Sequence, residues 1–327
     1  MVVRLAVLVA VLLLGENVAS ARIVAVGDLH GDFAAWRAVA LDAGLIDAKG
    51  RWRGGATTLV QLGDTVDRGP DSLKIVEDLI RLQREAAKVR GRVVALVGNH
   101  EAMNVTNDLR YVSAGEYAAF TNARSAATRD ATYAANRAAI EAAYRKRDPA
   151  LTADAIRAAW MTATPLGALE HQAAWQPTGH IGKWVAGNPA VALIEGTLFV
   201  HGGIGPAYVQ VPLATINTRV AAALKAADID PASIINDEAG PLWYRGLAAP
   251  AVGGQLDTLL PAFGAQRIVI AHTPNLTGIV IAEGGRLARI DTGISSVYGG
   301  VPSWLEVADD GKFTAHVVAR PAAGGAK

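Results

Sequence analysis

Three short polar segments, each at the end of an apolar run, constrain this chain more than any other feature. They read GDLHG at Gly27–Gly31, GDTVDRG at Gly63–Gly69 and GNHE at Gly98–Glu101. The runs before them predict buried strands, because they are short, apolar and bounded by turn residues. These runs are residues 23–26, 58–62 and 93–97. Since each segment turns polar where its strand ends, we expect the three to line one cleft.

The spacing between these runs predicts an α/β fold. Residues 33–43 carry apolar side chains at helical intervals, and Asp71 is a suitable N-cap for a second helix that reaches Lys88. Strand, helix and strand in alternation open an α/β sheet. The second half is rich in expected strands separated by turn residues. These are residues 190–194, 197–200, 267–270, 278–282, 287–291, 303–307 and 313–318.

An alanine-rich stretch separates the two halves. Residues 116–160 have a helical pattern, and we expect a helical insertion or cap over about 116–180. We therefore predict one domain over residues 22–320, followed by a disordered alanine- and glycine-rich tail at 321–327.

The N-terminus has the layout of a secretory signal peptide. Arg4 precedes the apolar stretch Leu5–Leu14, and small residues end at Ala21. The stretch is shorter than the roughly 20 apolar residues of a membrane-spanning helix. We expect cleavage after Ala21, a periplasmic or secreted protein, and no stable membrane span afterwards. The alternatives are an N-terminal strand and an uncleaved anchor.

Composition excludes several kinds of chemistry and partner. The chain has no cysteine, so disulfides, thiolate zinc sites and a cysteine nucleophile are excluded. Its 31 basic and 30 acidic residues give a formal net charge of +1. No global field therefore favours nucleic acid or an anionic membrane as the main partner. Composition does not indicate the oligomeric state.

The histidines point to a metal site. Four of the seven stand at expected strand ends: His30, His100, His201 and His272. Imidazole and carboxylate ligands together suit Mn, Fe or Zn better than Ca, which prefers an all-oxygen shell. Two such ions about 4 Å apart can share a hydroxide and hold both ends of an in-line phosphoryl displacement. Asp64 is the candidate for the carboxylate that bridges them.

The motif segments resemble those of the calcineurin-like metallophosphoesterases, within the phosphoprotein phosphatase superfamily. Residues 99–104, 108–112 and 197–203 are similar to the Shewanella-like protein phosphatase branch. The resemblance covers roughly 23–120 and 180–300. It implies a four-layer α/β/β/α sandwich with a helical insertion, and a dinuclear-metal phosphomonoester hydrolase in which a metal-bridging hydroxide attacks phosphorus. The implied ligands are Asp28, His30 and His272 for one metal, Asn99 and His201 for the other, and Asp64 for both.

The resemblance also implies roles for the groups around the metals. His100 would protonate the leaving oxygen, and Asp67 would hold its ring in the required tautomer. Arg68 would bind the non-bridging phosphate oxygens with paired donors. Arg245 would be a second clamp, and its alternative is an exposed loop arginine. Glu101 is expected to support its turn.

Two other functions compete with this hypothesis. We predict that phosphorylated protein side chains are the substrate, but residues 271–274 and 291–293 fit a hydrolase of nucleotide polyphosphates, such as a diadenosine tetraphosphatase, equally well. A non-catalytic scaffold is the third possibility, because fold alone does not give function. The intact ligand set and the Asp67–Arg68 pair favour the phosphatase.

Overall fold

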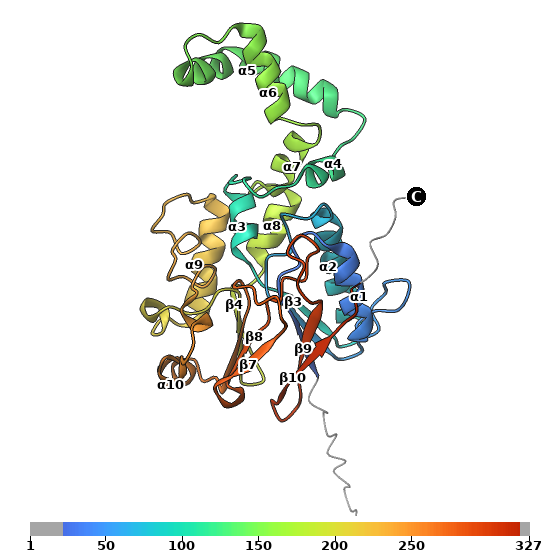
Figure 1. The fold of residues 1–327 in the computed structure, drawn as a ribbon, viewed down its shortest axis with the longest axis vertical. Coiled ribbons are helices and arrows are strands. Elements are labelled where there is room, and N and C mark those ends of the chain that lie inside the picture. Colours follow the sequence, from blue (N-terminus) through green and yellow to red (C-terminus); the bar gives the residue numbers. More distant parts are fainter. Residues whose placement is uncertain (1–21, 321–327) are drawn as a thin grey trace, which may run out of the picture.

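Residues 22–320 are described by a computed structural model, in which two five-stranded sheets pack face to face between outer helices (Figure 1). The predicted four-layer α/β/β/α sandwich is therefore confirmed. The expected signal peptide at 1–21 and the tail at 321–327 lie outside the described residues. No helix within 22–320 is long and apolar enough to cross a bilayer.

The first sheet holds the three motif strands side by side. Its order is β10-β9-β1-β2-β3, in which β1, β2 and β3 run parallel and β9 and β10 are antiparallel. Every residue of β1 and β2 is buried, as expected for parallel strands covered on both faces. The strands are β1 Ile23–Val26, β2 Thr58–Gln61, β3 Arg92–Ala95, β9 Ser303–Val307 and β10 Phe313–Val317.

Two helices cover the outer face of this sheet. In α1 (Phe33–Asp42), the Asp32 side chain caps the N-terminus by accepting a hydrogen bond from the Ala35 amide at 2.9 Å. Helix α2 (Ser72–Ala87) begins after Asp71 as predicted, but the Asp71 side chain makes no capping bond and pairs with Lys74. Buried side chains from both helices form one core with the sheet.

The second sheet has the order β4-β5-β6-β8-β7, with β5, β6 and β8 parallel. Helices α9 (Leu213–Ala226) and α10 (Gly253–Ala262) contribute to the core on its outer face. Short 3-10 turns lie at η1 Pro206–Tyr208, η2 Gly246–Ala248 and η3 Glu283–Gly285. The strands are β4 Val191–Ile194, β5 Thr197–Val200, β6 Arg267–Ile270, β7 Val280–Ala282 and β8 Leu287–Arg289.

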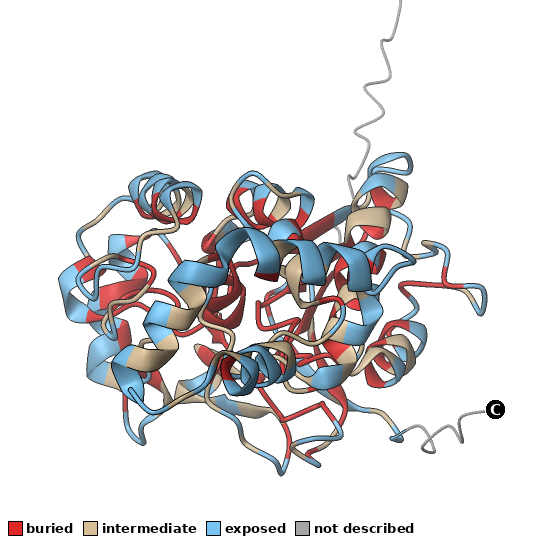
Figure 2. Ribbon diagram, turned by 90° about the horizontal axis from the view of Figure 1, so that it is seen from above, coloured by how far each residue is buried: buried red, intermediate tan, exposed pale blue. Residues whose placement is uncertain are grey.

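A third core fills the space between the sheets. Val60 and Leu62 from the first sheet meet Phe199 and Val269 from the second, all fully buried. Figure 2 shows the same pattern from above, with buried residues inside and exposed residues on the outer helical faces. The two sheets therefore hold their strand ends at a fixed separation.

The alanine-rich stretch forms a helical projection above the sandwich (Figure 1). Residues 116–160 are helical, as their pattern indicates, but in separate helices, because the chain leaves helical geometry at 120–124 and again at 148–152. Pro149 explains the second break, since proline cannot continue a helix and disfavours helical geometry in the residue before it. The helices between β3 and β4 are α3 Asn99–Val105, α4 Ala114–Ala119, α5 Ser125–Arg147, α6 Ala153–Ala163, α7 Ala168–Trp175 and α8 His180–Gly187.

We call α5 and α6, with their flanking turns at 123–165, the outer arm. Within it only Ser125, Tyr133 and Ile156 are buried. Its two ends lie side by side, because a Cβ added to Gly167 would overlap the carbonyl oxygen of Tyr117 and lie 2.9 Å from Thr121 Oγ1. The outer arm therefore leaves the body and returns to it at one place.

Candidate active site

The parallel strands of both sheets end at one edge of the sandwich, and polar side chains gather there. This placement follows from topology, because the carboxyl ends of parallel strands share one edge. The side chains are Asp28 and His30 after β1, Asp64, Asp67 and Arg68 after β2, Asn99 and His100 after β3, His201 after β5, His272 after β6 and Asp291 after β8.

Asp64 lies at the centre of this cluster. Its Oδ2 atom is 3.8 Å from Nε2 of His30, 3.8 Å from Nε2 of His100 and 3.4 Å from Nε2 of His201. Its Oδ1 atom accepts a hydrogen bond from the His100 amide at 2.9 Å. Asp64 therefore occupies the position that a bridging carboxylate requires.

Two groups of potential ligand atoms share Asp64. His30, Asp64 and His100 form one, and Asp64, His201 and His272 form the other, each within 4.8 Å. The resemblance implied that His272 shares a metal with Asp28 and His30. The structure groups the His272 ring with His201, while the His272 amide donates to Asp28 Oδ1 at 3.3 Å. The reason is topological, because β5 and β6 are adjacent strands of the second sheet.

The remaining implied ligands complete each side. Asp28 Oδ2 lies 3.8 Å from His30 Nε2, and Asn99 Oδ1 lies 3.0 Å from His201 Nε2. One side of the cluster is therefore built from the first sheet. The other combines Asn99 at the start of α3 with two histidines from the second sheet.

The imidazoles fit a metal. His30 Nδ1 donates to the Val66 carbonyl at 2.9 Å, and His201 Nδ1 donates to the Leu62 carbonyl at 2.7 Å. Such bonds keep the proton on Nδ1, so that the lone pair of Nε2 can bind a metal. His272 Nε2 is buried and has no hydrogen-bond partner among residues 22–320. An unpaired buried nitrogen is costly unless a ligand satisfies it.

The electrostatics point the same way. Burial lowers the pKa of His30 to about 3 and also depresses the pKa of His272, so both rings are neutral and able to bind metal. Burial, with the charges of Asp291 and Asp64, raises the pKa of Asp28. Burial likewise raises the pKa of Asp291 to about 6. Crowded buried carboxylates of this kind are stabilised when a cation lies between them.

The backbone around the cluster is held in unusual conformations. Asp64 and His272 are in the left-handed region, with φ of 52° and 66°. Such residues persist where the surrounding structure determines them, and they concentrate at functional sites. Glu101 supplies part of that support, because it accepts hydrogen bonds from the amides of Gly98, Asp64 and Thr65 at 2.8–2.9 Å. It supports the turn, as the sequence suggested.

His100 and Asp67 form a buried pair beside the cluster. His100 Nδ1 lies 2.5 Å from Asp67 Oδ2, and the relative exposures of the two residues are 4% and 0%. Asn104 Nδ2 donates to the other oxygen of Asp67 at 2.9 Å. Burial alone would lower the pKa of His100, but the carboxylates of Asp64 and Asp67 outweigh it and raise that pKa. This pair can hold a proton on an imidazole that faces the metal ligands.

Comparisons with known proteins agree with this arrangement. The sequence model of the calcineurin-like phosphoesterases matches residues 21–292. The chain belongs to that family. It is a metal-dependent phosphatase, and family membership implies divalent metal ions. Shewanella-like protein phosphatase 2 of Arabidopsis thaliana is 31% identical over 88% of this chain and 75% of its own length.

Solved structures are similar in fold to this phosphatase. The cold-active protein-tyrosine phosphatase of a psychrophilic Shewanella species has a TM-score of 0.66 at 23% identity, covering 92% of this chain and 81% of that one. A protein serine/threonine phosphatase from Saccharomyces cerevisiae has a TM-score of 0.54 at 16% identity, covering 93% and 81%. At these identities the likeness concerns the fold alone.

Two arginines lie beside the cluster of the phosphatase. The Arg68 guanidinium carbon lies 4.4 Å from the centre of the Tyr111 ring and 5.1 Å from that of Tyr298. Arg245 donates from Nη1 to the His272 carbonyl at 2.9 Å and to Thr273 Oγ1 at 3.0 Å. Both arginines therefore lie beside the cluster, Arg68 against two tyrosine rings and Arg245 against the loop that follows β6.

Several residues of this site escaped the sequence reasoning. Tyr298 comes from the loop between β8 and β9, and Tyr111 comes from the segment between α3 and α4. Only a fold places these residues near His30 and His100, so no local pattern marks them. Asn104 had a signal, because it follows His100 by four residues, the spacing of one helical face.

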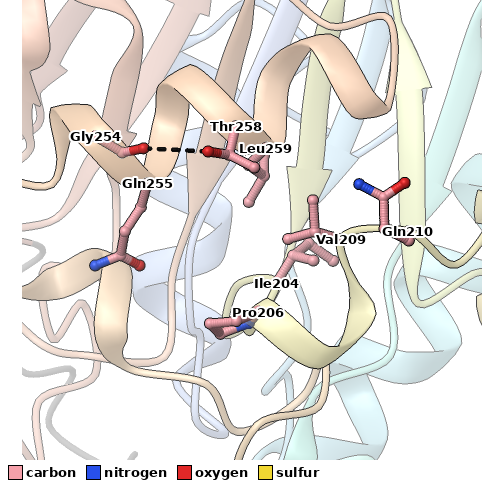
Figure 3. Close-up of a pocket in the computed structure, with 8 residues that line it drawn as sticks. All are labelled: Ile204, Pro206, Val209, Gln210, Gly254, Gln255, Thr258 and Leu259. Atoms are coloured by element: carbon pink, nitrogen blue, oxygen red, sulfur yellow. Dashed lines mark hydrogen bonds between the residues drawn. The ribbon is translucent and has the colours of Figure 1, made fainter.

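A separate cavity contains none of the residues of this site. This cavity, of about 330 Å³, is lined by Ile204 and Val209 on one side and by Gln255 and Leu259 of α10 on the other (Figure 3). Its lining is mostly apolar, and it contains no charged side chain. It does not contribute to the metal cluster.

Proposed function

We propose that this phosphatase hydrolyses phosphomonoesters on protein side chains and holds two metal ions, drawn from Mn, Fe and Zn. The observation that carries the proposal is the position of Asp64 between two ligand groups, with the His100–Asp67 pair beside them. When bound, the metals would polarise the phosphate and supply the nucleophile. A relative named as a protein phosphatase supports the choice of substrate.

The chain's own residues would divide the remaining work. His100 would donate a proton to the leaving oxygen, while Asp67 keeps its ring oriented and favours the charged form. Arg68 and Arg245 would bind the non-bridging oxygens, where charge grows in the transition state. Arg68 Nε is buried without a hydrogen-bond partner in the described part of the chain, which leaves this donor for a phosphate.

We propose phosphotyrosine as the preferred side chain. Tyr111 is exposed and Tyr298 half-buried, and their rings lie on Arg68. Each ring also lies beside a histidine of the cluster, Tyr111 at 5.1 Å from His100 and Tyr298 at 5.2 Å from His30. An aromatic ester could stack on such rings, and a pair of aromatic rings contributes about 0.5–1.5 kcal/mol beyond its buried area.

Turnover of matched substrates tests the proposal. Phosphotyrosine and phosphoserine peptides of one sequence would be compared with a dinucleoside polyphosphate, each with Mn, Fe and Zn. We expect the enzyme to turn over both peptides and to hydrolyse the phosphotyrosine peptide faster than the phosphoserine peptide. We expect Tyr111→Ala to lose that preference. Strong preference for the dinucleoside polyphosphate would reject the phosphoprotein assignment. Equal rates on both peptides would reject only the tyrosine preference.

We also propose that the protein is exported. Support comes from the Leu5–Leu14 apolar stretch and the small residues before Arg22. Expression of the full chain in a bacterium, followed by cell fractionation and N-terminal sequencing, tests this. Export predicts a periplasmic or secreted product that begins at Arg22. A cytoplasmic product that retains Met1 would contradict it.

A further inference from the structure

The turn that carries Asp67 and Arg68 is held in a conformation that its own residues do not favour. Asp67 has φ of 69° and Arg68 has φ of 71°, both in the left-handed region. Consecutive left-handed residues other than glycine cost of order 1–3 kcal/mol each, so contacts from elsewhere must hold them. The position of this turn sets both the partner of His100 and the phosphate-binding Arg68.

Much of that support comes from the segment at residues 111–116, which leads into α4. The Arg68 amide donates to the Tyr111 carbonyl at 2.9 Å. Ser113 Oγ donates to the Gly69 carbonyl at 3.0 Å. The Asp67 amide donates to Glu116 Oε2 at 3.2 Å and shares that hydrogen with Ser72 Oγ at 3.1 Å. Each residue of the turn therefore has a partner in this segment.

Glu116 is the unusual member of the segment. Its relative exposure is 1%, and no basic side chain pairs with it in the described residues. Its Oε1 atom accepts from the Ser113 amide at 2.9 Å, which closes a capping box at the start of α4. Its Oε2 atom reaches the Asp67 amide instead of solvent. A cap alone needs no burial, and burying a carboxylate is costly unless it is hydrogen-bonded.

We propose that Glu116 is a positioning residue for this phosphatase, which fixes the Asp67–Gly69 turn so that the general acid and the phosphate clamp are both in place. The inference rests on the proposed roles of His100 and Arg68. Glu116 acts through Asp67 and does not touch the substrate. Glu116 connects helix α4 to the Asp67–Gly69 turn, and through Asp67 to the general acid His100.

The test is Glu116→Gln, because the amide keeps the size but has only one oxygen acceptor for the two amide groups. We expect kcat/KM on a phosphoserine peptide to fall by about tenfold or more, since general acid catalysis contributes roughly 10²–10⁴-fold and is lost with its geometry. On p-nitrophenyl phosphate, whose leaving group needs little protonation, we expect a fall of about threefold or less. The diagnostic measurement is therefore kcat/KM on the phosphoserine peptide divided by kcat/KM on p-nitrophenyl phosphate.

Two variants make the outcome decisive. Glu141→Gln makes the same chemical change on the outer arm, where Glu141 pairs with Arg137 and Arg145, and should leave both rates unchanged. Glu116→Asp keeps the charge and can still cap α4, but it is one methylene too short to reach both amides. It should lower the same ratio, and it serves as the test if Glu116→Gln does not fold.

A wild-type ratio in a folded Glu116 variant overturns the inference, because a mere cap would change stability alone. Unchanged metal content, measured by elemental analysis, is also expected. If the wild type hydrolyses p-nitrophenyl phosphate but no phosphopeptide, the proposed substrate fails. Phenyl phosphate, with a more basic leaving group, then replaces the peptide, so the inference about Glu116 is still tested.

Discussion

At the scale of single residues, the His100–Asp67 pair is the most constrained polar contact of the site. Both side chains are buried, the hydrogen bond measures 2.5 Å, and Asn104 holds the second oxygen of Asp67. Because Asn104 holds the Asp67 carboxylate in place, that carboxylate fixes the tautomer of the His100 ring. His100 Nδ1 therefore donates its hydrogen bond to Asp67. His100 Nε2 lies 3.8 Å from Asp64 Oδ2 and can donate a proton to the substrate.

Replacing His100 should separate acid catalysis from metal binding. We expect His100→Asn to lower kcat on a phosphoserine peptide by about 10²–10⁴-fold while the metal content stays at the wild-type level. The control is His316→Asn, the same change on β10, where His316 stacks on Trp304 far along the sheet from the motif loops. Full activity of His100→Asn on this substrate would reject the acid assignment.

Glu116 should make the stability of the protein depend on pH. Burial and the charge of Asp67 raise the pKa of Glu116 to about 7, from an ordinary value of 4.5. The folded state thus binds this proton more tightly than the unfolded state, so stability falls as the pH rises from about 4.5 to 7.

In Glu116→Gln that dependence should be absent. The stability of the wild type relative to the variant should fall by on the order of 3 kcal/mol between about pH 4.5 and pH 8. Urea unfolding of both proteins across this range measures the difference. Parallel pH curves for the two proteins would show that Glu116 is not perturbed.

At the scale of elements, the site is a set of strand ends brought together by two sheets. The first sheet was largely predictable, because its motif strands are consecutive apolar runs followed by glycine and a polar residue. The grouping of His272 with His201 was not predictable from the sequence, because it depends on the pairing of β5 with β6. Glu116 and Tyr111 also escaped, because their contacts with Asp67 and Arg68 join positions more than forty residues apart.

Two motif glycines allow the loops after β2 and β3 to approach each other closely. A Cβ on Gly98 would overlap Asp64, so the chain after β3 can approach the β2 loop only where a side chain is absent. Gly63, with φ of 91°, gives the same loop a conformation that other residues rarely adopt. The motif glycines therefore place the central carboxylate between the two sheets.

Asp64 should be the residue on which metal binding depends most. We expect Asp64→Asn to bind less metal in both ligand groups, because each includes this carboxylate. Metal content after dialysis and the rise in melting temperature on adding Mn measure the loss. Asp257→Asn, which alters an exposed ion pair with Arg286, is the matched control. Wild-type metal content in Asp64→Asn would place the bridging ligand elsewhere.

At the scale of the whole molecule, the sandwich and the outer arm are separate in their packing. The three apolar cores found within residues 22–320 draw on both sheets and their helices, and the buried residues of the outer arm are not among them. The arm's own interior is small, with Tyr133 beside Trp160 at 5.3 Å between ring centres. The arm thus contributes little to the stability of the body that holds the site.

Removing the outer arm should therefore leave a folded, metal-binding phosphatase. Residues 123–165 can be replaced by two glycines, because Thr121 and Gly167 lie side by side and the base helices α4 and α7 remain. We expect a melting temperature within a few degrees of the wild type, since no buried core is opened. Activity on p-nitrophenyl phosphate should stay within about threefold, because Tyr111, Ser113 and Glu116 still hold the Asp67–Gly69 turn. A deletion that folds but loses metal or this activity would show that the outer arm helps to organise the site.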